Sequence, residues 1–105
     1  MNQETVKYNL RLAEKANSLL QEAHKSVVRI EASYINWKGD EAFVVRVAYD
    51  NYPNSEFCMS YDNIFVIKDD YALTIYDVET ILSKALEINE RETARRIEAH
   101  KRVTR

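Results

Sequence analysis

VVRIEASYINWKGDEAFVVRVAYD, residues 27–50, is the stretch that decides the fold of this chain. Apolar and polar residues alternate on both sides of Lys38-Gly39-Asp40, and a period of two is typical of strands with one buried face. Gly39 is the only glycine in the chain, and its place between two such runs indicates a turn. The stretch therefore predicts an antiparallel hairpin, with strands over about 27–37 and 42–50.

Helical patterns flank this hairpin on both sides. Apolar residues recur at spacings of three and four from Val6 onward, which predicts a helix over about 3–26 with Asn2 as its cap. Thr74-Ile75-Tyr76-Asp77 is similar to a capping box and predicts the start of a second helix. Between the hairpin and this helix, residues 56–68 favour one strand, or two strands broken at Asp62-Asn63.

The resulting order predicts an α+β two-layer sandwich: an N-terminal helix, a three- to four-stranded antiparallel sheet and a long C-terminal helix. Residues 1–105 are expected to form a single domain, with 89–105 either a charged helical extension or a frayed tail. The order resembles that of double-stranded-RNA-binding domains. Those domains begin their last helix with a basic, lysine-rich clamp, whereas TIYDVETILSK at 74–84 opens acidic, so the resemblance is limited to the order of elements.

The composition argues against an enzyme. The chain has two isolated histidines, His24 and His100, one cysteine, Cys58, and no catalytic motif. We therefore expect no catalytic residues, no cofactor and no metal site, and we interpret Asp69-Asp70 as a polar strand end. Cys58 is expected to be a small core residue. Phe43, Tyr34, Tyr49, Phe57 and Phe65 are expected to serve the core.

No apolar run is long enough for a membrane span, and the N-terminal stretch lacks the features of a secretory signal. The sequence therefore predicts a cytoplasmic protein without membrane association.

Charge is distributed unevenly along the chain. Residues 1–38 carry a net charge of +2, residues 39–79 of −7 and residues 80–105 of +3, although the whole chain has a net charge of only −2. Ten of the eleven aromatic residues lie between Tyr34 and Tyr76, in or beside the acidic stretch. Tyrosines and carboxylates together are typical of surfaces that bind basic partners. The alternative is an ordinary strand composition with polar strand ends, which has no functional meaning.

The leading hypothesis is a non-enzymatic interaction module that binds a basic surface of another protein, such as a nuclease. By analogy of size and charge, it would be a phage-type inhibitor that mimics nucleic acid, as anti-CRISPR proteins do. The expected partner-binding residues are Asp50, Tyr52, Asp62, Asp69, Asp70 and Tyr71.

A second hypothesis places a nucleic-acid-binding site on the basic C-terminal helix. Its candidate residues are Arg91, Arg95, Arg96, Lys101 and Arg102. Acidic residues dilute this positive charge, and no aromatic residue lies among the arginines to stack on bases. The same helical extension could instead form a homodimer.

Overall fold

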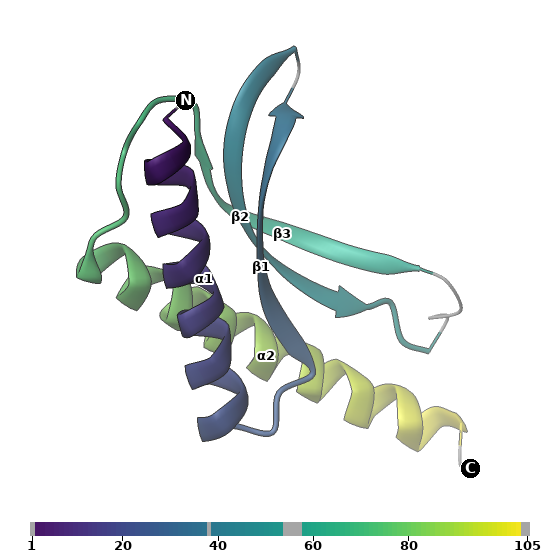
Figure 1. Cartoon of the computed structure of the whole chain (residues 1–105). Helices are drawn as coiled ribbons and strands as arrows, with labels where there is room; N and C mark the ends of the chain where they lie inside the picture. Colours follow the sequence, from purple (N-terminus) through teal and green to yellow (C-terminus); the bar gives the residue numbers. More distant parts are fainter. Residues whose placement is uncertain (1, 38, 54–57, 104–105) are drawn as a thin grey trace.

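The computed structural model describes residues 2–37, 39–53 and 58–103. Its elements, in chain order, are α1 (Gln3–Ala23), β1 (Val28–Trp37), β2 (Asp40–Asp50), β3 (Met59–Ile67) and α2 (Ile75–Val103). The strands form one antiparallel sheet in the order β1-β2-β3, and both helices lie on the same side of it (Figure 1). The predicted α+β fold is confirmed, with three strands rather than four.

Helix α1 begins as the sequence predicts. The side chain of Asn2 accepts a hydrogen bond from the main-chain N–H of Glu4 at 2.8 Å, which satisfies a donor left unpaired at a helix start. The helix ends at Ala23, earlier than the predicted residue 26, because His24 is already extended. The main-chain N–H of Val27 instead donates to the side chain of Asn89 at 2.8 Å, so α2 positions the start of β1.

The hairpin forms where the sequence predicts it. β1 and β2 pair from Val28 opposite Tyr49 to Trp37 opposite Asp40. Gly39 has a φ of +91°, in the left-handed region where a side chain would be strained. Its N–H donates to the side chain of Asn36 at 2.9 Å, which closes the turn.

β3 is one continuous strand, so the alternative of two strands broken at Asp62-Asn63 is wrong. The irregularity takes the form of a β-bulge: Val45 pairs with Phe65 and Arg46 with Asn63, which leaves Ile64 as the additional residue. The predicted strand start at Glu56 lies outside the described residues.

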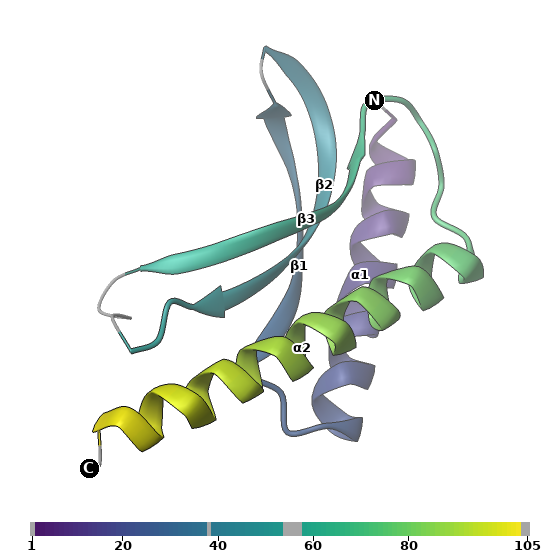
Figure 2. The ribbon, with the colours of Figure 1, turned by 180° about the vertical axis from the view of Figure 1, so that it is seen from behind.

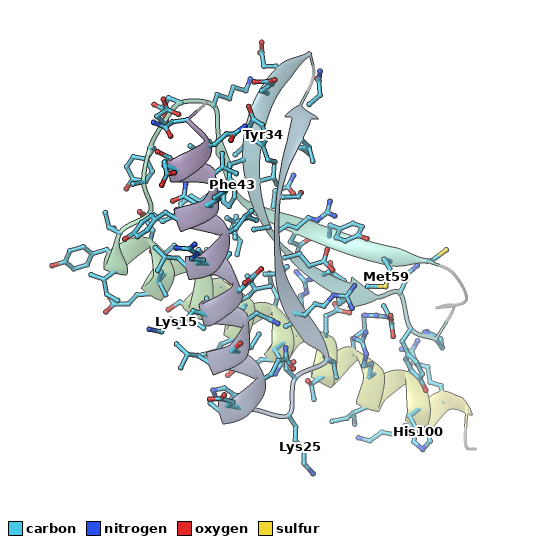
Figure 3. All side chains as sticks on the ribbon, in the orientation of Figure 1. Lys15, Lys25, Tyr34, Phe43, Met59 and His100 are labelled. Atoms are coloured by element: carbon cyan, nitrogen blue, oxygen red, sulfur yellow. The ribbon has the colours of Figure 1, made fainter. Side chains whose placement is uncertain are left out.

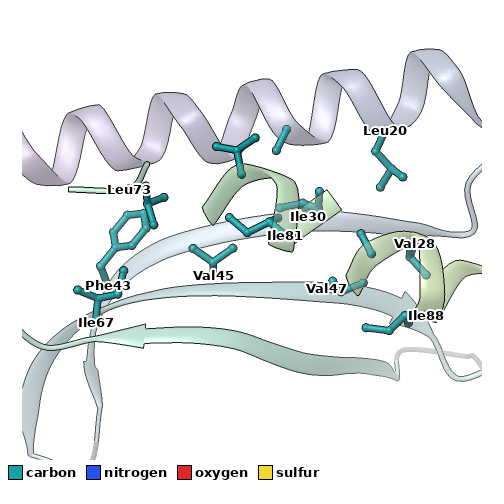
Figure 4. Packing of buried hydrophobic residues seen from close by; sticks show 13 residues of the cluster. Leu20, Val28, Ile30, Phe43, Val45, Val47, Ile67, Leu73, Ile81 and Ile88 are labelled. Carbon is teal, nitrogen blue, oxygen red and sulfur yellow. The ribbon is translucent and has the colours of Figure 1, made fainter. Parts of the chain in front are cut away.

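The core lies between the helices and one face of the sheet (Figure 4). The central strand contributes Phe43, Val45 and Val47, each with no exposed surface. Leu20 of α1 and Ile81 of α2 pack against this face and are also fully buried. The alternating residues of β2 therefore supply the floor of a single core, as the period of two predicts.

Two predictions for individual core residues are wrong. Tyr34 is 39% exposed, because it lies on an edge strand near the hairpin turn, where its hydroxyl stays accessible while its neighbour Phe43 is buried (Figure 3). Cys58 is exposed, because it precedes β3 rather than belonging to the sheet. Tyr49 and Phe65 are half-buried against the core, and Phe57 lies outside the described residues.

The segment between β3 and α2 is tied to α1 by one buried side chain. Asn9 has no exposed surface, and its amide donates to the carbonyl of Tyr71 at 3.0 Å and accepts from the N–H of Leu73 at 2.9 Å. This pairing satisfies Asn9 inside the core and holds the residues just before α2 against α1.

Candidate protein-interaction surface

The six predicted partner-binding residues fall into two groups at opposite ends of β3 (Figure 1). One group lies where β2 ends and β3 begins, beside the second half of α2: Asp50, Tyr52 and Asp62. The other group follows the last residue of β3, near the start of α1: Asp69, Asp70 and Tyr71. The structure therefore does not unite them into one surface.

Beside the first group, a buried carboxylate gathers three arginines of α2. The side chain of Glu92 is only 4% exposed and lies 2.8 Å from Arg95, 2.9 Å from Arg96 and 3.3 Å from Arg91. Burial opposes ionisation of this carboxyl, but the hydrogen bonds from Arg95 and Arg96 outweigh it. The pKa of Glu92 consequently lies below its ordinary value.

The same arginines bind the opposing sheet end. Arg91 forms an ion pair with Asp62 at 3.1 Å and donates to the hydroxyl of Tyr49 at 3.0 Å. Arg96 donates to the carbonyl of Asp50 at 2.8 Å, and Arg95 donates to the carbonyl of Tyr52. We call Arg91, Glu92, Arg95 and Arg96, together with these four partners, the arginine clamp.

In the arginine clamp, three of the residues expected to bind nucleic acid contact three of the residues expected to bind a partner protein. Three of the five cations expected to meet nucleic acid bind partners in the same chain, namely Tyr49, Asp50, Tyr52, Asp62 and Glu92. Their charge is thus engaged in holding α2 to the sheet. Lys101 and Arg102 are exposed in the last turn of α2, beyond the clamp.

The second group belongs to a larger acidic surface. This surface comprises carboxylates from the hairpin, from the β3–α2 segment and from the first turn of α2, and two tyrosines that bind Glu41 and Asp77. We call this set the acidic end: Tyr34, Asp40, Glu41, Asp69, Asp70, Tyr71 and Asp77. Within the described part of the chain, one ion pair joins it to a base, between Asp40 and the exposed Lys68 at 3.5 Å.

Hydrogen bonds organise the acidic end. Tyr34 donates to Glu41 at 2.5 Å, and this bond raises the pKa of Tyr34 above its ordinary value. Tyr71 donates to Asp77 at 2.7 Å, and the pKa of Tyr71 is raised for the same reason. Both phenols therefore stay protonated at neutral pH, and each holds a carboxylate in place while its ring remains half-exposed.

The predicted capping box supports this geometry. The N–H of Thr74 donates to Asp77 at 2.8 Å, and the N–H of Asp77 donates back to the hydroxyl of Thr74 at 3.3 Å. Burial opposes ionisation of Asp77, but the hydrogen bonds that its carboxylate accepts from Thr74 and Tyr71 outweigh it, so the pKa of Asp77 lies below its ordinary value. Asp77 therefore carries its negative charge throughout the neutral range.

Exposed apolar side chains adjoin the acidic end. Ile75 is 67% exposed and Tyr76 75% exposed in the first turn of α2, next to Asp77. Sequence reasoning did not select Ile75, Tyr76, Tyr34, Glu41 or Asp77 as site residues. Their position in the sequence could have indicated the exposure of Ile75 and Tyr76, because both precede Val78, the first residue of the buried stripe of α2.

The described residues contain no group of three or more His, Cys, Asp or Glu side chains arranged to hold a metal ion. His24 is an exposed residue at the end of α1. Among the helices in the described ranges, none has the length and apolar character needed to cross a bilayer.

Comparisons with protein-family models, with curated proteins and with solved structures give no match to this chain.

Proposed function

We propose that this chain is a non-enzymatic interaction module that binds a basic surface of another protein through its acidic end. The observation that supports the proposal is that two half-exposed tyrosines, Tyr34 and Tyr71, each bind a carboxylate on a part of the surface that also carries Asp40, Asp69 and Asp70. Tyrosine offers a large contact area at a low entropic cost, and the carboxylates favour and accelerate the approach of a cationic partner.

The finer proposal is a competitive inhibitor. A nucleic-acid channel is a basic surface shaped to receive phosphates, and the carboxylates of the acidic end would take the place of phosphates there. Phage-type inhibitors of nucleases are the functional class that this mechanism describes. Such a partner would bind either this chain or its nucleic acid, but not both at once.

Reversal of charge tests the proposal. The full chain is used to capture its partner from the native host, and binding of the purified partner is then measured by biolayer interferometry. We expect the Asp69→Lys, Asp70→Lys double variant to weaken binding by about tenfold or more, and binding of the unmodified chain to weaken as salt rises. An excess of DNA or RNA should displace a partner of the nuclease type.

The matched control is the Glu14→Lys, Glu22→Lys double variant, which makes the same change in net charge on exposed positions of α1. It should bind the partner within about twofold of the unmodified chain. Equal binding by both double variants, without dependence on salt, would rule out the acidic end as the binding surface.

The structure favours the nucleic-acid-binding alternative less. Arg91, Arg95 and Arg96 already bind acceptors within the chain, so phosphate contacts would have to replace the arginine clamp. A gel shift of DNA or RNA by the full chain at low salt would revive this alternative.

A further inference from the structure

The start of β1 and the edge strand β3 differ in how their outer main-chain groups are satisfied. On the edge strand β1, the carbonyl of Val28 accepts from Gln21 at 3.0 Å, and the N–H of Ile30 donates to Asn17 at 2.9 Å. Both side chains come from α1. Along β3, within the described residues, no side chain bonds to the main chain in this way. The outer main-chain groups of β3 are therefore available to another strand.

A groove lies between this edge and α2. Figure 2 shows the courses of the two elements, with α2 in front of the sheet. Its volume is about 600 Å³, and it exists because the helices pack over β1 and β2 while α2 diverges from β3. Ile64 and Phe65 of β3 and Ile88 of α2 line it with apolar surface, and the exposed Thr80 and Lys84 lie on its helical side.

The β-bulge gives the groove its apolar wall. Without the additional residue, neighbouring side chains of a strand would point to opposite faces of the sheet. With it, Ile64 and Phe65 both pack toward the helices and both line the groove. The wall therefore offers a wider apolar surface than a regular strand would.

Charges in the groove are balanced, and the edge beyond it leads past one base, Lys68, to the carboxylates of the acidic end. Asp62 pairs with Arg91, and Lys84 lies 3.7 Å from Glu87, so the groove has no net charge. Beyond Phe65 the edge continues into a smaller hollow of about 350 Å³ that Val66 and Ile67 line together with Lys68, Asp69 and Tyr71. Lys68 pairs with Asp40 at 3.5 Å, which leaves the carboxylates of Asp69 and Asp70 for a basic segment.

We propose that β3 receives an extended segment of the partner protein as a fourth strand, seated in the groove against α2. The segment would have apolar residues at alternate positions beside Ile64 and Phe65, and lysine or arginine where it reaches the acidic end. A segment that runs from the groove to the acidic end would have about eight to ten residues, at roughly 3.3 Å per residue. This inference rests on the proposed function and adds the form and polarity of the recognised segment.

A blocking substitution tests the groove separately from the acidic end. Thr80→Trp places an indole in the groove, and Ser83→Trp adds the same indole to α2 at an exposed position that does not line the groove. The probe is a phage-displayed library of random 12-residue peptides, selected on the full chain. The strongest binder is then synthesised with a fluorescent label and titrated by anisotropy.

We expect selected peptides that alternate apolar residues and carry lysine or arginine at one end. Thr80→Trp should weaken binding by about tenfold or more, Ser83→Trp by less than about twofold, and a proline in the middle of the peptide should abolish binding. Hydrogen exchange of β3 amides should slow when the peptide binds. Lys84→Trp serves as a second blocking variant if Thr80→Trp does not fold.

Three results would overturn the inference. Peptides that lose affinity with Asp69→Lys, Asp70→Lys but not with Thr80→Trp would leave the acidic end as a binding surface and remove strand addition. Unchanged hydrogen exchange of the β3 amides in a saturated complex would also rule out strand addition. A dimer of this chain that Thr80→Trp dissociates, detected by light scattering, would make a second copy the occupant of the groove.

Discussion

Glu92 shows how one side chain decides the role of its neighbours. In the sequence it is one of several acidic residues spread among arginines, and its spacing indicates only an ordinary i,i+4 pair with Arg96. In the structure it is buried, and it orients Arg91 and Arg95 as well as Arg96. These arginines reach across to the sheet, so the carboxylate acts as the centre of the arginine clamp.

Removal of this charge should destabilise the fold. We expect Glu92→Gln to lower the free energy of unfolding by about 2 kcal/mol, because a buried ion pair that loses one partner leaves the others uncompensated. The partly exposed arginines keep the loss below that of a fully buried pair. Urea denaturation of this variant, with Glu98→Gln on the exposed side of α2 as control, measures the difference.

The lowered pKa of Glu92 predicts that the stability contributed by this carboxylate depends on pH. Because the folded pKa of Glu92 lies below its ordinary value of 4.5, its stabilisation is complete above that value and is lost as the pH falls through the folded pKa. The difference in stability between the unmodified chain and Glu92→Gln should be constant from about pH 6 to 8 and shrink below about pH 4.5. A constant difference down to pH 3 would contradict a depressed pKa.

At the scale of single elements, the conformation of the hairpin turn depends on one local residue and not on packing. The hairpin turn depends on Gly39, whose φ of +91° suits glycine, and nothing lies within 4 Å of the position that a Cβ would occupy. The cost of a side chain there is thus conformational and not steric.

We expect Gly39→Ala to lower the free energy of unfolding by about 1 kcal/mol. Gly39→Asn should cost less, because asparagine tolerates the left-handed region better. Thermal denaturation of both variants provides the measurement, and equal stability of alanine and glycine at this position would contradict the backbone explanation.

At the scale of the whole molecule, α2 has two functions along its length. Up to Ile88 it packs against the core, and beyond Ile88 the arginine clamp joins it to the end of the sheet. The acidic and basic segments of the sequence partly neutralise each other here, whereas the acidic end lies at the opposite end of β3. The folded surface therefore does not keep the division of the sequence into an acidic middle and two basic ends.

Deletion of residues 90–105 should separate these two functions. The core residues of α2 up to Ile88 remain, so we expect the shortened chain to fold, with a free energy of unfolding lower by about 2 to 4 kcal/mol. Hydrogen exchange should increase most at the start of β3, where Asp62 loses Arg91. Unchanged exchange there would show that the clamp does not hold the sheet.

By itself, the sequence determined the order of elements, the hairpin and its turn, the cap of each helix and the placement of the acidic stretch. These features follow from periodicity, from one glycine and from capping residues, all of which act over a few residues. Three of the residues expected to bind a partner, Asp69, Asp70 and Tyr71, lie in the acidic end, and their role stays a prediction.

Only the tertiary structure decided which charges meet. The ion pair between Asp62 and Arg91, and the bonds of Arg95 and Arg96 to residues 50–52, join segments far apart in the chain. The bulge at Ile64 and the divergence of α2 from β3 likewise depend on how the layers pack. Local patterns do not encode such distances, because side-chain pairing across elements depends on the arrangement that burial of the common core imposes.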